Sequence, residues 1–464
     1  MKTEARTITL EEALALSRSE SVALYKQHVN PGLCTLLGIV GFDRRFVEAH
    51  GVTVVDEHGR EYLDFLGGYG ALNFGHNHPE IVEAVRRVEA MPNILQAAVG
   101  ALVGPLGASL ASLLPGDLNK SFFCSSGAEA VEGALKMARI ATGRTDFVYA
   151  DGSFHGKSFG ALSVTGRTKY QEPFQPLLPG CHAVPFGDID ALTRTLAEHE
   201  CAAFIIEPIQ GEGGIVVPPE GYLSAAADAC AAAGALLILD EIQTGFGRTG
   251  TIFAAEHEDV VPSIMTTAKS LGGGVMPLGA FSTTDATWDR TYGGTEKCTL
   301  HTSTFGGNAR AMAAGLKAIE ILVRDGLAEA AGTKGARFKG ELERIAADSH
   351  LIKEVRGRGL MIGVEFYEPH LVKKLSAEYL AASVGGLLLE DHGIITAYTL
   401  NNPNVIRFEP PLIVTDAQID HVLESFEQVV NKHHGLVGVM AGLGRTMVTR
   451  GHRGSGHGEE RHAG

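Results

Sequence analysis

Lys269 stands in a sequence setting that suits an amine acting as a nucleophile. It follows the largely apolar run SIMTTA and is followed, after two residues, by three consecutive glycines. Burial lowers the pKa of a lysine and so frees the neutral amine to attack a carbonyl carbon. Consecutive glycines let the backbone pass close beside a bulky ring. Most lysines are solvated surface charges, so a surface position is the alternative, but the pattern favours a Schiff-base lysine.

Asp240 belongs to a second pattern, ALLILDEIQTGFGRTG, in which an acid follows a buried apolar strand. The carboxyl edge of such a strand is where α/β enzymes place catalytic groups. A carboxylate buried there needs a cationic partner, and the protonated pyridine nitrogen of a cofactor would supply one. A helix N-cap or a structural ion pair would also explain an acid at this point. The glycine-rich sequel TGFGRTG favours a tight loop near a ligand.

The run SSGAEA, residues 125–130, joins the apolar strand SFFC to the helical pattern EAVEGALKMARIATG. A helix that begins on such small residues directs free backbone N–H groups and the positive end of its dipole outward, which suits a phosphate. An ordinary N-cap on Ser125 or Ser126 would explain the same residues. By itself this run leaves both interpretations open.

Short apolar runs that alternate with helical stretches must position these residues. The runs SFFCSS, DFVYADG, AAFIIEPI and ALLILDE are each flanked by turn residues. Short and nearly continuous apolar runs between helices are typical of parallel strands buried on both faces. We therefore predict an α/β fold with a large, doubly wound and mostly parallel sheet, together with a smaller α+β domain.

The two ends of the chain carry the pattern of that smaller domain. Residues 5–30 predict a polar amphipathic helix that ends in a turn at Asn30-Pro31-Gly32, and a hairpin is expected around Glu57-His58-Gly59. After about residue 310 one long helical segment precedes short strands in IKEVRGRGLMIGVEF and NVIRFEPPL. The expected division is 1–75 for the N-terminal part of the small domain, 76–320 for the large domain, 321–440 for the C-terminal small domain and 441–464 for a disordered tail.

The composition excludes several classes of function. The formal net charge is -15 over 464 residues and the pI is near 5.7, which disfavours binding to nucleic acid or to anionic membranes. The six cysteines show no CxxC spacing, so we expect reduced thiols and no metal site. The first residues lack the apolar segment of a signal peptide, and no apolar stretch is long enough to span a membrane. A cytoplasmic protein is expected.

Seven motifs in order resemble those of the class III (ω- or ornithine-type) aminotransferases of pyridoxal 5'-phosphate (PLP) fold type I. They are SSGAEA, SFHGKSFGALS, IIEPIQGEGG, LILDEIQTGFGRTG, TTAKSLGGG, STFGGNA and IRFEPPL, and the resemblance extends over about residues 45–425. Within this family, the chain is most similar to putrescine (diamine) aminotransferases in Asn30-Pro31-Gly32, FFCSSGAEAVEGALKMA, PFQPLLPG followed by VPFGDID, and TLNNPNVIRFEPPL. The resemblance implies fold type I, a PLP cofactor and transamination.

The resemblance also implies a role around the cofactor for each matching residue. Lys269 would form the internal aldimine and then move the proton between Cα and C4′. Asp240 would keep the pyridine nitrogen protonated and Gln243 would reach the phenolic oxygen. Phe154 would stack on the ring, with core packing as its alternative. The phosphate would be held by backbone and hydroxyl donors of Ser126, Gly127 and Ala128.

Further residues of the family pattern concern the second subunit and the substrate. Thr304 in HTSTFGGN would reach the phosphate bound by the other subunit, which implies a homodimer with shared active sites. Arg407 in IRFEPPL would bind the carboxylate of glutamate or 2-oxoglutarate through two hydrogen bonds. Glu212 in EPIQGEGG would pair with Arg407 when the amine donor has no α-carboxylate. Tyr69 would line the substrate pocket or pack in the core, and Glu207 is expected to be structural.

The expected function is that of an ω-aminotransferase that moves the amino group of a terminal amine, such as the diamine putrescine, to 2-oxoglutarate or pyruvate. The alternatives on the same fold are an enzyme that aminates a larger terminal aldehyde from an amino-acid donor, an acetylornithine- or ornithine-type aminotransferase, and an aminomutase. A PLP-fold binding or regulatory protein is disfavoured by the intact Lys269, Asp240 and Arg407. Ala309 and Ser263 depart from the family pattern, at loop positions that leave the cofactor chemistry unchanged.

Overall fold

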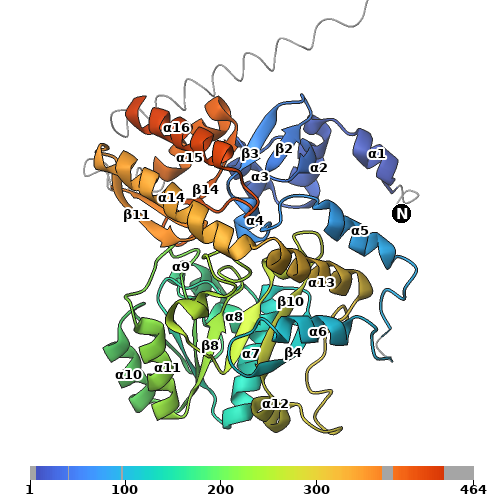
Figure 1. Cartoon of the computed structure of the whole chain (residues 1–464), viewed down its shortest axis with the longest axis vertical. Coiled ribbons are helices and arrows are strands. Elements are labelled where there is room, and N and C mark those ends of the chain that lie inside the picture. The colour runs from blue at the N-terminus through green and yellow to red at the C-terminus, as the bar shows by residue number, and fades with distance from the viewer. Residues whose placement is uncertain (1–6, 40, 96–97, 368–379, 433–464) are drawn as a thin grey trace, which may run out of the picture.

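The computed structural model describes residues 7–39, 41–95, 98–367 and 380–432. These segments form one sheet of seven strands and two sheets of four strands. Figure 1 shows the N-terminal segment, in blue, and the C-terminal segment, in orange and red, together at one end of the molecule, with the large sheet at the other. The N-terminal and C-terminal segments are joined directly, because β13 (Ile394–Ile395) pairs in parallel with β3 (Glu61–Asp64).

The large sheet has the strand order β4-β10-β9-β8-β7-β5-β6. Its strands are β4 (Leu118–Cys124), β5 (Asp146–Ala150), β6 (Cys181–Val184), β7 (Cys201–Ile206), β8 (Leu236–Asp240), β9 (Ile264–Thr267) and β10 (Gly279–Thr284). Neighbouring strands from β6 to β9 run parallel, and all six residues of β7 are buried. This confirms the predicted α/β fold with a mostly parallel sheet.

The edge of this sheet departs from the parallel pattern. The SFFC run lies in β4, as predicted for a strand, but β4 pairs only with β10, and it does so antiparallel. Strand β10 is also antiparallel to β9. The sheet therefore carries a reversed strand between β4 and the parallel set, which apolar runs alone do not reveal because they carry no information on strand direction.

The helices of this part of the chain precede, separate or follow the strands of the large sheet. They are α5 (Pro79–Arg87), α6 (Val103–Ala111), α7 (Gly127–Thr142), α8 (Phe159–Ser163), α9 (Thr168–Gln171), α10 (Ile189–Glu198), α11 (Tyr222–Ala233), α12 (Asp285–Thr291) and α13 (Ala309–Arg324), with the 3₁₀ helices η1 (Glu172–Phe174), η2 (Ala254–Glu258) and η3 (Lys269–Gly272). Helix α7 lies close against the sheet because Gly133 has no side chain. A Cβ at this position would lie 2.1 Å from the Phe281 ring of β10.

The N-terminal segment corrects two predictions. A single helix over residues 5–30 is wrong, because α1 (Leu10–Ala15) ends and α2 (Arg18–His28) begins on a capping box between Ser17 and Glu20. The turn at Asn30-Pro31-Gly32 is also wrong, since Pro31 starts α3 (Pro31–Ile39) and Asn30 accepts a hydrogen bond from the Leu33 N–H. Both helix starts carry local signals, Ser-x-x-Glu and Asn-Pro, that could have been recognised.

The hairpin predicted at residues 57–59 is confirmed. It joins β2 (Thr53–Asp56) to β3 in antiparallel register, and β1 (Phe46–His50) adds a third antiparallel strand next to β2. The short helix α4 (Gly67–Gly70) follows β3 and contains residues in the left-handed conformation. This segment will carry Tyr69 into the substrate region.

The C-terminal segment has the predicted mixture of helices and antiparallel strands. Its sheet has the order β11-β12-β15-β14, with β11 (Ile352–Arg358), β12 (Met361–Phe366), β14 (Ala397–Tyr398) and β15 (Val405–Phe408). Helices α14 (Leu327–Ala347), α15 (Leu380–His392) and α16 (Asp416–Lys432) complete this segment. The predicted long helical segment is two helices, α13 and α14, because Gly326 adopts a positive φ of 58° between them.

The structure does not test two of the predictions made from the sequence. The predicted disordered tail lies outside the described residues, and the domain boundaries stay predictions. Within the described segments, no helix is both long and apolar enough to cross a membrane.

Candidate active site

A cavity of about 520 Å³ lies where β8 and β9 end, beside the start of α7. Seven of the eight residues that the resemblance assigns to the cofactor line this cavity: Ser126, Gly127, Ala128, Phe154, Asp240, Gln243 and Lys269. They come from segments that are far apart in the sequence, and the parallel sheet brings them together at the carboxyl ends of its strands. The other predicted residues lie around this cavity or outside it.

Lys269 follows β9 and begins the 3₁₀ helix η3. Its φ of 46° is in the left-handed region, which costs free energy for a residue with a side chain and is often found where function requires a fixed position. Burial lowers the pKa of the Lys269 amine, although the Glu409 and Glu212 carboxylates oppose this shift. The amine is therefore easier to deprotonate than that of an ordinary lysine, as a nucleophile requires.

Asp240 ends β8 and is held from several sides. Its Oδ2 lies 2.6 Å from Nδ1 of His155, and its Oδ1 accepts hydrogen bonds from the Ile242 N–H and the Thr266 hydroxyl. Both Asp240 and His155 are buried. With the Asp240 carboxylate as acceptor, Nδ1 of His155 is the donor. This carboxylate is thus fixed in direction before any ligand arrives.

His155 is a functional candidate that the sequence analysis missed. It lines the cavity next to Phe154, and its buried Nε2 has no hydrogen-bond partner among the described residues. The signal was local, since the histidine beside Phe154 in SFHGKS is a polar residue where core packing would place an apolar one. A buried nitrogen without a partner beside a cavity indicates that a ligand or a water completes the site.

Glu207 keeps the wall of the cavity in place. Its carboxyl accepts hydrogen bonds from the N–H of Phe154 at 2.9 Å and of Gly211 at 3.0 Å. Burial raises the pKa of Glu207 to about 7, with the nearby His155 and Asp240 acting in opposite directions. These contacts agree with the structural role expected for Glu207. They also fix the backbone at Phe154, whose ring lines the cavity.

The start of α7 offers an anion-binding surface to the cavity. The first hydrogen bond between main-chain groups of this helix runs from the Ala130 N–H to the Ser126 carbonyl, so the N–H groups of Gly127 and Ala128 precede it. The Ser126 hydroxyl accepts a hydrogen bond from the Glu129 N–H at 3.2 Å, so Ser126 is the N-cap of α7. An N-cap on Ser125 or Ser126 was the alternative interpretation of this run. A Cβ on Gly127 would lie 2.9 Å from the Ile242 side chain, so this close approach requires glycine.

Gln243 links the cavity to a second buried group. Its Nε2 donates to Oε1 of Glu409 at 2.7 Å, and Glu409 follows β15 in the C-terminal segment. An amide nitrogen carries two N–H groups. One N–H is used by Glu409, which leaves the other for a ligand in the cavity.

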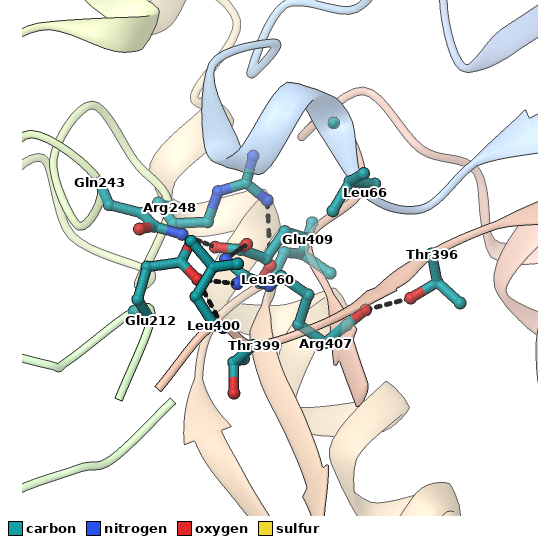
Figure 2. Close-up of polar contacts among 12 residues, drawn as sticks. Leu66, Glu212, Gln243, Arg248, Leu360, Thr396, Thr399, Leu400, Arg407 and Glu409 are labelled. Carbon is teal, nitrogen blue, oxygen red and sulfur yellow. Dashed lines mark hydrogen bonds and ion pairs between the residues drawn. The ribbon is translucent and has the colours of Figure 1, made fainter. Parts of the chain in front are cut away.

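Arg407 and Glu212 form a buried ion pair, shown in Figure 2. The Arg407 Nη2 lies 2.5 Å from Oε2 of Glu212, whose Oε2 also accepts from the Leu400 N–H at 2.9 Å. Burial alone would raise the pKa of the Glu212 carboxyl, but Arg407 holds it below its usual range. The Tyr69 ring covers the guanidinium at 5.1 Å, and Tyr69 itself is 45% exposed. The structure thus brings these three predicted substrate residues together.

Thr304 does not line the first cavity, and neither do Arg407, Glu212 and Tyr69. Thr304 is exposed in this single chain. The neighbouring Phe305 lines a second cavity together with Ser125, Met276 and Pro277. These last three residues also line the first cavity. The two cavities are therefore contiguous.

The residues around the first cavity fit a phosphorylated pyridine aldehyde. Backbone N–H groups at the start of α7 suit the phosphate, and the Asp240 carboxylate suits a protonated ring nitrogen. The Lys269 amine suits the aldehyde, and one N–H of Gln243 suits a phenolic oxygen. The donor set of this cavity therefore matches the functional groups of PLP one by one.

A separate cluster of Asp146, His182 and His199 has the residue types of a metal site. Its potential ligand atoms lie within 4.8 Å of one another, and Asp146 accepts a hydrogen bond at 3.0 Å in its pair with His182. The two imidazole rings are stacked at 3.7 Å with an interplanar angle of 16°. Because a metal ion must lie near the plane of each imidazole that binds it, these nearly parallel rings do not converge on one ion. We assign no metal site here.

Comparisons with known proteins agree with the geometry of the cavity. A family model described as "Aminotransferase class-III" matches residues 41–430. The ornithine aminotransferase from Toxoplasma gondii, in a structure that reports partial occupancy of PLP at the active site, is 30% identical with a TM-score of 0.80, and the match covers 95% of this chain and 100% of that chain. An (S)-enantioselective omega-transaminase from Thermomicrobium roseum is 32% identical with a TM-score of 0.80, covering 93% and 100%.

A third similar structure is the acetylornithine aminotransferase from Elizabethkingia anophelis, at 29% identity and a TM-score of 0.75, covering 90% of this chain and 100% of that chain. The family match spans nearly all of the described chain, and the cavity holds residues suited to each group of PLP. The chain therefore belongs to the class-III aminotransferases and is a PLP-dependent transaminase of fold type I.

Proposed function

We propose that this transaminase moves the amino group of a terminal amine, such as a diamine, to 2-oxoglutarate or pyruvate. The observation that carries the proposal is the buried ion pair between Arg407 and Glu212. An enzyme restricted to α-amino acids needs only the arginine. An internal carboxylate on that arginine is useful when one of the two substrates has no carboxylate to offer.

The residues of the first cavity would act together on the reacting atoms. Bound PLP supplies a carbonyl for the amine and a ring that withdraws electrons from the bond being broken. The Lys269 amine would take the proton from the substrate carbon and return it at the neighbouring position. Asp240, aimed by His155, would hold the proton on the pyridine nitrogen. The N–H groups of Gly127 and Ala128 would hold the phosphate in place.

The ion pair would work as an exchange of anions on Arg407. With an amine donor in the site, the guanidinium would otherwise be buried without a counter-ion, which is costly. Glu212 satisfies it at 2.5 Å in the structure. When a 2-oxo acid enters, its carboxylate would take the place of Glu212 and form two hydrogen bonds to the guanidinium. The Tyr69 ring would cover the arginine in both states.

An ornithine- or acetylornithine-type aminotransferase is the second candidate. It is favoured by the similarity to the Toxoplasma gondii and Elizabethkingia anophelis enzymes at 30% and 29% identity. Such an enzyme would also transfer a terminal amino group, but from a donor that carries an α-carboxylate at its far end. A biosynthetic enzyme that aminates a larger aldehyde would use the same residues in the opposite direction.

The test separates the two half-reactions by single-turnover absorbance of the cofactor. Arg407→Ala should largely spare the reaction with an amine donor but slow the return reaction with 2-oxoglutarate by about a hundredfold or more. Glu212→Ala should make amino acids better donors and remove the advantage of the amine. Equal slowing of both halves in both variants would mean that Arg407 is a structural cation and that no exchange takes place. A panel of amines, ornithine and acetylornithine then separates the candidate donors.

We also propose that two copies of the chain share their active sites through Thr304. In support, Thr304 is exposed in the single chain, and apolar side chains near the second cavity, Leu95 and Phe305, are 58% and 57% exposed. Such apolar exposure at the mouth of a cavity is typical of a surface covered by a partner. A homodimer would place Thr304 of one copy at the phosphate of the other.

Mixed dimers test this arrangement. Lys269→Ala and Thr304→Ala copies, unfolded together and refolded, should regain activity, because one site of each mixed dimer contains both intact residues. The control is each variant refolded alone. If the mixtures never exceed the activity of the better parent, Thr304 does not act across subunits.

A further inference from the structure

Arg407 has a second carboxylate partner, Glu409, which the proposed exchange does not use. Oε2 of Glu409 lies 3.4 Å from Nη1 of Arg407, and its Oε1 accepts from Gln243. Figure 2 shows Glu212 and Glu409 both near the Arg407 guanidinium, with Gln243 beyond Glu409. Two carboxylates thus share one guanidinium, and each has a different set of further contacts.

Glu409 is held much more firmly than Glu212. It is fully buried, its N–H donates to the Phe65 carbonyl at 2.8 Å, and two prolines follow it in the chain. A Cβ on Gly67 would lie 2.3 Å from the Glu409 carbonyl oxygen, so α4 packs directly on this backbone. Glu212 instead lies on a loop between β7 and α11 and retains a slight exposure of 6%. Glu212 can therefore be replaced on Arg407 by a substrate carboxylate, whereas Glu409 is fixed in position.

The charges of this region do not balance. Arg407 and Arg248 are the two buried arginines of the described segments, and Arg248 donates to backbone carbonyls and to Asn73 rather than to a carboxylate. The carboxylates whose charge acts on them are Glu212 and Glu409 for Arg407, and Glu409 and Asp64 for Arg248. Three carboxylates therefore face these two guanidiniums. With the Lys269 amine deprotonated, as its role as a nucleophile requires, these carboxylates outnumber the guanidiniums by one.

We propose that Glu409 determines the charge preference of the substrate pocket, so that amine donors with a second positive charge are favoured over donors with a distal carboxylate. The inference rests on the proposed function, since it assumes that the far end of the donor lies near Arg407 and Glu212. Glu409 has no exposure and acts through its field rather than through contact. Fields of buried charges are weakly screened, so they extend to neighbouring groups.

The consequences differ for three donors of the same length. The distal ammonium of a diamine is attracted by the excess negative charge and can pair with Glu212 without displacing it from the pocket. A monoamine has no distal charge and is indifferent to the field. A distal carboxylate displaces Glu212 from Arg407, but the Glu212 side chain stays nearby. Glu409 then repels both the donor carboxylate and Glu212, instead of Glu212 alone. The preferred donor class is therefore a diamine.

The test is a charge series measured on the holoenzyme with Glu409→Gln, which removes the charge but keeps an oxygen to accept from Gln243. The donors are 1,4-diaminobutane, butylamine and 4-aminobutyrate, all with the same oxo acid. We expect kcat/KM for the diamine relative to butylamine to fall about tenfold, and that for 4-aminobutyrate relative to butylamine to rise about tenfold. Calorimetry should show tighter binding of glutarate, a dicarboxylate that cannot react.

Two further variants separate charge from packing. Glu409→Asp keeps the charge in a shorter side chain and should keep the wild-type order of the three donors. Glu241→Gln is the matched control, because Glu241 is equally buried but makes its contacts with Thr244 and Ala255, away from Arg407. Its donor ratios should match those of the wild type. If Glu409→Gln does not fold, a loss of the donor order in Glu409→Asp would itself contradict the inference.

Several outcomes would overturn the inference. They are unchanged donor ratios in Glu409→Gln, an equal change for all three donors, or the same loss of order in Glu409→Asp as in Glu409→Gln. Failure of the proposed function looks different, because the wild-type enzyme would then not convert any of the three amines. A wild type that converts them, with a donor order that is independent of Glu409, would refute only the present inference.

Discussion

Asp240 and Glu212 are both buried carboxylates with a basic side chain as partner, yet the structure holds them in opposite ways. Asp240 ends a central strand and contacts His155, Ile242 and Thr266 through its two oxygens. Glu212 lies on a loop, and both contacts described for its side chain, to Arg407 and Leu400, use a single oxygen. One carboxylate is fixed by its surroundings on every side, and the other depends mainly on one charged partner.

The difference matches the ligands that each carboxylate is proposed to serve. A cofactor stays bound through both half-reactions, so the group that pairs with its ring nitrogen gains from being fixed in advance. A substrate site must accept first an amine and then an oxo acid, so a counter-ion that can be replaced is an advantage there. Under this proposal a fixed carboxylate and an exchangeable one serve the same active site, and variants of each should give distinct patterns of loss.

The largest loss is expected from Lys269→Ala, within the rigid region. Removing this amine removes both the nucleophile and the proton carrier, so turnover should fall by several orders of magnitude with every donor. The purified wild type should be yellow, and borohydride should fix the cofactor on the peptide that contains Lys269. Fixation on a different lysine would contradict the assignment.

A smaller but still general loss is expected from Asp240→Ala. Leaving the pyridinium without its buried partner costs about 3–5 kcal/mol, and both half-reactions should slow together. This contrasts with Glu212→Ala, which should alter the choice of donor. Single-turnover absorbance of each half-reaction distinguishes the two patterns. Near-normal turnover in Asp240→Ala would show that this carboxylate is only a structural cap of its loop.

The smallest effect concerns stability and the acid next to Asp240. Burial raises the pKa of Glu241 to about 7 from 4.5. A raised pKa in the folded state means that this group contributes stability fully below about pH 4.5, and that the contribution is lost as the pH rises through about 7. The loss is on the order of 3 kcal/mol. Glu241→Gln cannot titrate, so its unfolding temperature should fall less than that of the wild type between pH 5 and 8.

Glu207 provides the comparison for that measurement. Its pKa is also raised to about 7 by burial, so the wild type should lose stability over the same pH range even after Glu241 is replaced. The double variant Glu207→Gln and Glu241→Gln should show the flattest pH dependence. If both variants follow the wild-type curve, these carboxyls titrate at ordinary pKa values in the folded protein.

The sequence by itself determined which residues could reach the cofactor cavity. Lys269, Asp240 and the run that starts α7 each follow a strand, and the apolar and glycine pattern around each is contained within about 15 residues. A local pattern of this kind specifies a strand end and a tight loop without knowledge of the rest of the fold. The carboxyl ends of parallel strands then meet at one edge, so these residues converge.

Only the tertiary structure decided which polar groups became partners. His155 is 85 residues from Asp240, Glu409 is 166 residues from Gln243, and Arg407 is 195 residues from Glu212. No local pattern links residues that far apart, because the pairing depends on strand order and on how the C-terminal segment packs against the loops of the large sheet. The family pattern indicated Glu212 as a partner of Arg407. No pattern indicated Glu409, although it lies only two residues from that arginine in the chain. Its contact with Arg407 is seen only in the folded structure, where α4 packs on the backbone at Glu409.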